Sequence, residues 1–280
     1  MKNSGFVPFH LNATEDDLAG NDGIGRYLLL PGSDGRAKEI AEHFENASLK
    51  PHPRGHNLYL GTLTHEGKKI DVATVATGMG CPSVEIVLHE LFQLGAKRFL
   101  RIGTAGSLQP DRIDAGNLIN VQASVRDEKT TTNYTPIEVP AVASLEFVST
   151  ILLTAEKLGL SDILHTGIAH CKSSLYAREF GVGPRAAENA AYLKLMTASG
   201  ILASEMETAA LFIQSQIYNY QLSLQGHDSH HRVLAGAILA IVSTPKKSAP
   251  GTTKNNKTIE NGVQLALETV KTLAVQERLG

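Results

Sequence analysis

The sequence has few of the features that mark secreted, membrane or nucleic-acid-binding proteins. It contains only two cysteines in 280 residues, and Cys81 and Cys171 are too far apart for a CxxC pair, which argues against a disulfide framework and a zinc site. No apolar run reaches the roughly 18 residues of a membrane span, and the N-terminus lacks the apolar core of a signal peptide. The net charge of -2 gives no basic footprint for nucleic acid. We therefore expect a cytoplasmic protein without nucleic-acid or membrane partners.

What the sequence does contain is an alternation of short apolar runs and amphipathic stretches. A hydrophobic content of 42% is enough for a large core. The runs predict strands at 26–32, 69–78, 98–104, 117–125, 165–171 and 234–243, and the stretches predict helices at 35–46, 83–95, 141–159, 205–220 and 257–275. No repeat or linker divides the chain. We predict a single α/β domain over 1–280, with a central mixed β-sheet flanked by helices and a surface loop at 221–232.

Two glutamates stand at an unexpected place, in the stretch "SEMETAA" that leads into an apolar helix. Glu205 and Glu207 flank Met206, and ionised carboxylates are almost never fully buried without partners. The pair therefore indicates a ligand, a cation or solvent.

Arginines beside glycine turns indicate a second polar feature. Arg36 ends "PGSDGR", Arg54 lies in "HPRGHNLYLG", and Arg101 begins "RIGTAGS". Guanidinium groups bind phosphate oxygens in a bidentate way, and glycines let backbone N–H groups approach an anion. Each arginine alone is more typical of a surface ion pair. Their joint occurrence favours a phosphate site.

The glycine-rich segment "TGMGCPS" (77–83) precedes a predicted helix but lacks the acidic residue that a dinucleotide-binding loop would have about 20 residues later. Two interpretations remain open. The segment is either a tight turn for close strand–helix packing or one wall of a ligand pocket.

Six segments together resemble the hexameric nucleoside phosphorylases. They are "LPGSDGR", "HPRGHNLYLG", "TGMGCPS", "FLRIGTAGSLQP", "YTPIEVPAVA" and "SEMETAALF", in the order and spacing of that family. Two segments, "TPIEVPAVA" and "ASVR" (123–126), are more similar to its uridine branch. The resemblance implies a phosphate site of Gly32, Arg36, Arg54, Arg101 and Thr104, with Arg54 reaching in from a neighbouring subunit. It also implies a ribose site of His10, Glu205, Met206 and Glu207, in which His10 crosses the same interface. Arg101 and Glu207 are then the catalytic residues.

The segment that would contact the base departs from the family pattern. It reads "CKSSLYAREFGVGPRAA", with Leu175 where a stacking phenylalanine is expected. Glu179 and Gly181 fall where a glutamine and an arginine are expected, and Arg178 or Arg185 is a possible substitute. Leu175, Tyr176, Arg178 and Glu179 are the predicted base-binding residues.

The resemblance implies a pentosyltransferase that cleaves uridine with phosphate to give uracil and ribose 1-phosphate, in pyrimidine salvage. Phosphate is a co-substrate, and we expect no cofactor and no metal. The assembly is expected to be at least a dimer and to be a trimer of dimers.

Alternative functions are a purine or modified-nucleoside phosphorylase and an inactive nucleoside-binding homologue. The purine alternative is weakened because "IVSTPKK" has Ser243 and Thr244 where those enzymes have an aspartate, although Lys246 or Lys247 is a possible stabiliser of an anionic base. The histidines of 227–231 are expected to belong to a solvated loop and not to a metal site.

Overall fold

The computed structural model describes residues 5–226, 232–244 and 253–279. Its helices and strands follow one another along the chain as α1 (Glu15–Leu18), β1 (Tyr27–Pro31), α2 (Asp34–Ala41), β2 (Glu45–Lys50), β3 (Leu58–His65), β4 (Lys68–Val75), α3 (Cys81–Gln93), β5 (Arg98–Ser107), β6 (Leu118–Asp127), β7 (Ala141–Val142), α4 (Leu145–Lys157), β8 (Leu164–Lys172), α5 (Leu175–Phe180), α6 (Ala186–Ala198), β9 (Ala203–Glu205), α7 (Thr208–Leu224), β10 (Leu234–Ser243) and α8 (Thr253–Leu279).

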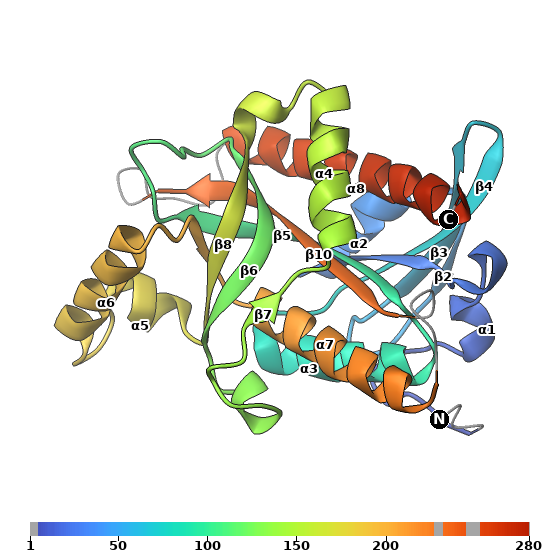
Figure 1. Cartoon of the computed structure of the whole chain (residues 1–280), viewed down its shortest axis with the longest axis horizontal. Coiled ribbons are helices and arrows are strands. Elements are labelled where there is room, and N and C mark those ends of the chain that lie inside the picture. Colours follow the sequence, from blue (N-terminus) through green and yellow to red (C-terminus); the bar gives the residue numbers. More distant parts are fainter. Residues whose placement is uncertain (1–4, 227–231, 245–252, 280) are drawn as a thin grey trace.

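A mixed sheet runs through the whole molecule in the order β10-β6-β8-β9-β5-β1-β4-β3-β2, with β7 paired to β6 (Figure 1). Strand β10 also pairs with β5, so β5, β10, β6, β8 and β9 close into a ring. The β10–β5 and β1–β5 pairs are parallel, whereas β9 meets β5 antiparallel. This closure brings β5 and the short strand β9, which carry different site residues, into direct contact.

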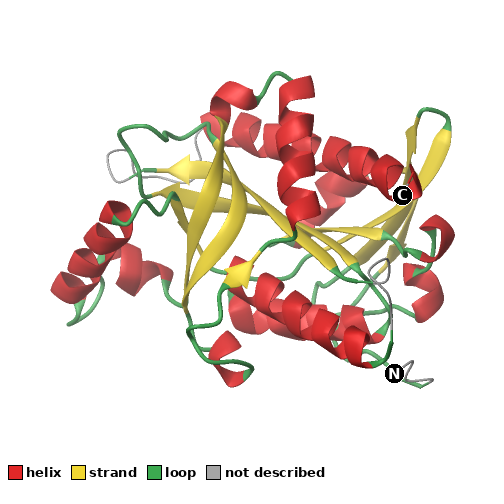
Figure 2. Ribbon diagram, in the orientation of Figure 1, coloured by secondary structure: helices red, strands yellow, loops and turns green. Residues whose placement is uncertain are grey.

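Helices cover the sheet on both faces, in two layers (Figure 2). Helices α3 and α7 share one core cluster, which includes Leu88 and Phe212, while α2, α4 and α8 share the other, which includes Ile40 and Phe147. Strand β10 is apolar along nearly its whole length because it has a helix layer on each side, as the sequence predicted. The structure thus confirms the predicted α/β class and central mixed sheet.

Several element boundaries differ from the sequence prediction. The helix expected at 35–46 ends at Ala41, and residues 45–50 form the edge strand β2, whose side chains are almost all exposed and so carry no apolar pattern. Residues 141 and 142 pair with β6 before α4 begins, and the helix expected from 205 begins at Thr208. The loop predicted at 221–232 was wrong at its start, because residues 221–224 form the end of α7. Residues 227–231 lie outside the described residues.

Helices α5 and α6 stand apart from the two layers, at the gold end of Figure 1. Helix α5 has no buried residue and α6 has only Asn189, so packing gives these helices no sequence signal and the prediction missed both. Across the described ranges, no helix is long and apolar enough to cross a membrane.

Candidate active site

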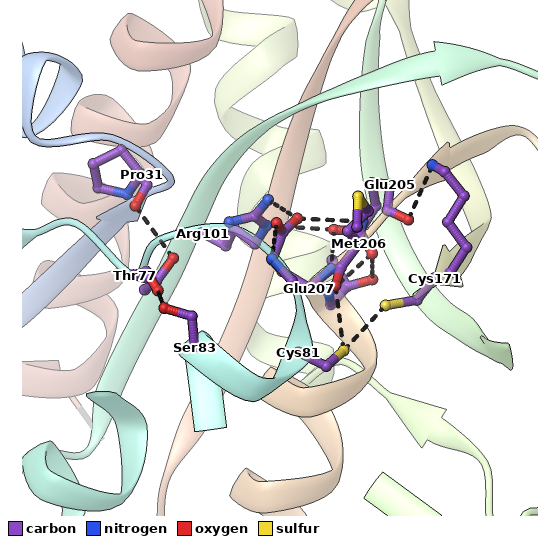
Figure 3. Close-up of polar contacts among 12 residues, drawn as sticks. Pro31, Thr77, Cys81, Ser83, Arg101, Cys171, Glu205, Met206 and Glu207 are labelled. Atoms are coloured by element: carbon purple, nitrogen blue, oxygen red, sulfur yellow. Dashed lines mark hydrogen bonds and ion pairs between the residues drawn. The ribbon is translucent and has the colours of Figure 1, made fainter. Parts of the chain in front are cut away.

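Arg101 lies at the centre of the predicted site, on β5, and is only 4% exposed. Its Nη2 donates to Glu207 Oε2, and its Nε lies 3.4 Å from Glu205 Oε2 (Figure 3). Burial works to lower the pKa of this guanidinium, but the negative charges of Glu207 and Glu205 raise it overall. Neither Nε nor Nη1 has a hydrogen-bond acceptor among the described residues. Arg101 is therefore charged, fixed, and has two nitrogens whose N–H groups are still to be satisfied.

Glu205 is held by the start of helix α7. Its Oε1 accepts from the Thr208 N–H and hydroxyl at 2.9 and 2.5 Å, and its Oε2 accepts from the Glu207 N–H at 2.9 Å. Burial works to raise the pKa of Glu205, but Arg101 and these donors lower it overall. Unpaired N–H groups and the dipole at a helix N-terminus stabilise a carboxylate in this position. Both oxygens are thus engaged within the protein, which favours a positioning role for Glu205.

Glu207 is fixed between two segments far apart in the sequence. Its Oε1 accepts from the Gly80 N–H at 2.7 Å, and its Oε2 accepts from Arg101 and, at 3.2 Å, from the Met206 N–H. Burial raises the pKa of Glu207 above its ordinary value; Arg101 opposes this shift, and the charge of Glu205 adds to it. The structure thus answers why two carboxylates stand in "SEMETAA": each has its own backbone donors, and both share Arg101.

The glycine segment 77–83 forms part of this wall. Gly78 and Gly80 have φ of +76° and +85°, which side chains rarely allow, and a Cβ on Gly78 would lie 2.2 Å from Ser83 Oγ. The Gly80 N–H faces Glu207, so the pocket-wall interpretation of this segment is supported. Cys81 and Cys171 are both buried, with their sulfur atoms 3.5 Å apart beside Met206 (Figure 3).

The other predicted phosphate residues come from several elements: Gly32 follows β1, Arg36 lies in α2, Thr104 lies on β5, and Arg54 lies in the loop between β2 and β3. Arg36 is half-buried near the start of α2, and burial lowers its pKa; Glu39 opposes this shift and the positive charge of Arg101 adds to it. Two arginines that repel each other while partly buried favour an anion between them. Gly32 and Thr104 are half-buried, whereas Arg54 is exposed.

His10 is anchored by Glu90 of α3. Its Nδ1 lies 2.8 Å from Glu90 Oε1, and the backbone N–H of His10 donates to the same carboxylate. Its neighbours Val7 and Phe9 are 81% and 73% exposed. The structure thus holds this histidine in place beside an exposed apolar segment, while its predicted role across a subunit interface stays a prediction.

The predicted base-binding residues divide into two groups. Arg178 donates to Asp127 and Asn189 at 2.8 Å each and lies over the Tyr192 ring, so it belongs to a cluster between the end of β6 and α6. A cavity of about 300 Å³ beside that cluster is lined by Asp127, Arg178 and Asn189 among others. Arg101, Glu205 and Glu207 do not line it. Leu175 and Tyr176 are 37% and 68% exposed. Glu179 instead pairs with Lys172 at 2.6 Å and lies near Gly106 of β5.

The sequence interpretation missed a buried polar network at the end of β8. His170 Nδ1 and Nε2 lie 3.0 Å from Ser204 Oγ and 2.9 Å from Asp127 Oδ2. Lys172 Nζ donates to Ser204 Oγ at 3.0 Å and lies 2.6 Å from Glu179 Oε1. The one available signal was the polar "HCKSS" after an apolar strand, at the sheet edge where α/β sites gather. Within the described ranges, no group of three or more His, Cys, Asp or Glu side chains could hold a metal.

Comparisons with known proteins show which family this chain is similar to. A family model described as the phosphorylase superfamily matches residues 26–271. The uridine phosphorylase of Treponema pallidum is 34% identical over 91% of this chain and 92% of its own length, and the guanosine phosphorylase of Halorubrum lacusprofundi is 28% identical over 72% and 75%. The crystal structure of a uridine phosphorylase from Vibrio fischeri has a similar fold, with a TM-score of 0.74 at 24% identity over 94% of each chain. The chain belongs to the phosphorylase superfamily.

Proposed function

We propose that this protein is a nucleoside phosphorylase that cleaves uridine with phosphate to give uracil and ribose 1-phosphate. Membership of the phosphorylase superfamily and the similarity to a uridine phosphorylase over 91% of the chain support this class of reaction. The role that follows is nucleoside catabolism, with uracil returned to pyrimidine salvage.

One observation carries the proposal: besides burial, the positive charge of Arg101 acts on Arg36 and lowers its pKa, and Arg101 Nη1 has no hydrogen-bond acceptor among the described residues. A phosphate dianion between the two guanidinium groups would relieve their repulsion and satisfy this donor. A hydrolase would have no use for such a site, because its nucleophile is water.

The chemistry needs no covalent nucleophile from the protein. A phosphate oxygen attacks the anomeric carbon, the C–N bond breaks, and its electron pair leaves with the base. The base then takes the proton that hydrogen phosphate loses as it becomes the sugar phosphate. Arg101 orients the phosphate. The negative charge of the phosphate stabilises the positive charge that develops on the ribose. Glu207 accepts from the ribose hydroxyls and shares Arg101 with the phosphate, so both reactants would be held by one charge network.

A purine or modified nucleoside is the second candidate substrate, because a relative named guanosine phosphorylase is 28% identical to this chain. A nucleoside-binding homologue without activity is the third. To separate them, we would incubate the protein with phosphate and a nucleoside panel and measure free base by chromatography. We expect phosphate-dependent release, fastest with uridine. Release without phosphate, or none from any nucleoside, would contradict phosphorolysis.

The proposal includes a shared site in a homo-oligomer, a trimer of dimers in which His10 and Arg54 complete a neighbour's pocket. Exposed apolar side chains near His10 support an interface there. Co-expression of His10→Ala and Arg101→Ala chains tests this arrangement. Each variant alone is expected to be impaired, whereas mixed oligomers would contain some sites with both residues intact and regain activity. Absence of recovery in oligomers that light scattering shows to be mixed would place His10 in its own subunit's site.

A further inference from the structure

The chain has only two cysteines, and they meet beside the candidate active site. Cys81 on α3 and Cys171 on β8 are separated by 90 residues, yet their sulfur atoms lie 3.5 Å apart (Figure 3). Both are free thiols and both are buried. The proposed reaction uses neither of them. Because a disulfide can form only between cysteines on adjacent backbone segments, this contact is the precondition for a bond between them.

The two cysteines belong to the backbone segments that hold the site glutamates. Gly80 directly precedes Cys81, and its N–H donates to Glu207 Oε1 at 2.7 Å. Cys171 lies opposite Glu205 in the pairing of β8 with β9. A bond between the two sulfur atoms would therefore join the turn before α3 to the strand pair that carries Glu205.

The turn before α3 would take up the movement that such a bond requires. The sulfur atoms have to approach from 3.5 Å to about 2.05 Å. Cys171 is held on both sides by the pairing of β8 with β6 and β9, whereas the turn has glycines on either side of Met79, which is 86% exposed. The Gly80 N–H would move with this turn. Its hydrogen bond to Glu207 is already near the optimal length, so a shift of about 1 Å would weaken it.

Hydrogen peroxide is an oxidant small enough to reach this pair, because the residues on either side of the Gly80–Cys81 step, Met79 and Pro82, are exposed. Cys81 is the first residue of α3, where the free N–H groups and the helix dipole favour negative charge on its sulfur. Burial, the contact with Cys81 and the charge of Glu205 raise the pKa of Cys171 well above its ordinary value. Cys81 is therefore the attacking sulfur, and Cys171 is the thiol that resolves the intermediate.

The oxidation proceeds in two balanced steps. The Cys81 thiolate attacks one peroxide oxygen, the O–O bond breaks, and the departing hydroxide takes up the proton that Cys81 lost and becomes water. The Cys171 sulfur then attacks the sulfur of the resulting sulfenic acid, the S–O bond breaks, and the hydroxide leaves with the Cys171 proton as a second water. Two thiols thus lose two hydrogens and two electrons, and one hydrogen peroxide is reduced to two waters.

We propose that Cys81 and Cys171 form a reversible oxidation site, at which hydrogen peroxide converts the two thiols into a disulfide that displaces Gly80 from Glu207 and weakens nucleoside binding. Formation of the bond is independent of the proposed function, whereas its effect on nucleoside binding rests on that function. A dithiol such as dithiothreitol restores both thiols by exchange.

The first test is chemical and needs no activity. Wild type is treated with hydrogen peroxide at neutral pH, denatured, alkylated and analysed by mass spectrometry. We expect the two free thiols of the chain to disappear, with the loss of two hydrogens, in a bond that non-reducing electrophoresis places within one chain, and dithiothreitol to restore them. Exposed Met79 is the internal control, because its sulfoxide shows that the oxidant was sufficient. Two free thiols in a sample with oxidised Met79, or a bond between chains, would overturn the proposal.

The second test measures uridine affinity by calorimetry before and after oxidation. Oxidised wild type should bind uridine at least about fivefold more weakly, since a hydrogen bond to a charged group is weakened, and dithiothreitol should reverse the loss. The matched control is Cys171→Ala, which cannot form the disulfide but has the same methionines. After the same treatment its affinity should stay within about twofold of its untreated value. An equal loss in Cys171→Ala, or a loss in wild type that dithiothreitol does not reverse, would assign the effect to methionine oxidation and overturn the proposed coupling.

These outcomes are distinct from failure of the proposed function. If reduced wild type neither bound uridine nor released base with phosphate, the function would fail, and the thiol count after peroxide treatment would still decide whether Cys81 and Cys171 form an oxidation site.

Discussion

The two ends of the candidate site are built differently. At the phosphate and ribose end, Arg101, Glu205 and Glu207 are 3–6% exposed, and their partners come from β5, the start of α7 and the turn before α3. At the base end, α5 has no buried residue and α6 has one. Under the proposed function, the step common to all nucleosides would be held by a rigid buried network, whereas base selection would depend on side chains that could change at little cost in packing.

Removing Arg101 should cause the largest loss of activity, because Arg101 links Glu205 and Glu207 in the buried network. Arg101→Ala should lower kcat/KM for phosphate by about 30- to 1,000-fold, the loss of about 2–4 kcal/mol of transition-state stabilisation. It also leaves two carboxylates without their shared cation, so the melting temperature should fall. Arg112→Ala, at an exposed position with no predicted role in the site, is the control and should change neither quantity measurably. Phosphate kinetics unchanged in a folded Arg101→Ala protein would exclude Arg101 from the phosphate site.

Replacing Glu207 separates a ribose contact from a structural one. Glu207→Gln keeps the volume but replaces one acceptor oxygen by a donor, so kcat/KM for uridine should fall about 10- to 100-fold. With 2′-deoxyuridine, which lacks one hydroxyl, the loss should be smaller, since the two changes remove the same interaction. The measurement is kcat/KM for both nucleosides on both proteins, with melting temperature as control. Equal losses for both sugars would show that Glu207 acts only through Arg101 and Gly80.

The raised pKa of Glu207 predicts how nucleoside affinity depends on pH. Burial raises the pKa of this carboxyl above its ordinary value of 4.5; Arg101 opposes the shift and Glu205 adds to it. Because only the ionised form accepts from two hydroxyls, nucleoside affinity should be lost as the pH falls through this raised pKa, while an ordinary glutamate would still be charged. Calorimetric titrations of uridine without phosphate, between pH 4 and 8, would show the midpoint. A midpoint at or below 4.5 would contradict the shift.

The smallest effect is expected at the base end, from Leu175→Phe. Leu175 is 37% exposed on α5, so a larger ring should fit without strain. An aromatic ring stacked on the base would add about 0.5–1.5 kcal/mol, which corresponds to a two- to tenfold lower KM for uridine. The kinetic measurement should accompany a melting curve, which we expect to stay within about 2 °C of wild type. An unchanged KM would show that Leu175 does not face the base.

Much of the fold could be predicted because its helices and central strands bury one face or both. Strand β10 and helices α3 and α4 have strong apolar patterns, and the prediction placed them within a few residues. The exposed strand β2 and helices α5 and α6 bury almost nothing, so no pattern marked them. Residues Lys246 and Lys247, proposed as stabilisers of the departing base, lie outside the described residues.

The sequence by itself determined the residue types of the site and their order: glutamates before an apolar helix, arginines beside glycine turns, and a base segment without its expected glutamine and arginine. Only the tertiary structure decided their partners. Gly80 meets Glu207 across 127 residues, and Arg101 meets it across 106. The physical reason is that a buried charge is stabilised by whichever donors the closed sheet brings to it, and sequence separation does not encode that proximity. The same holds for Lys172 and Glu179, whose pairing depends on how α5 leaves the end of β8.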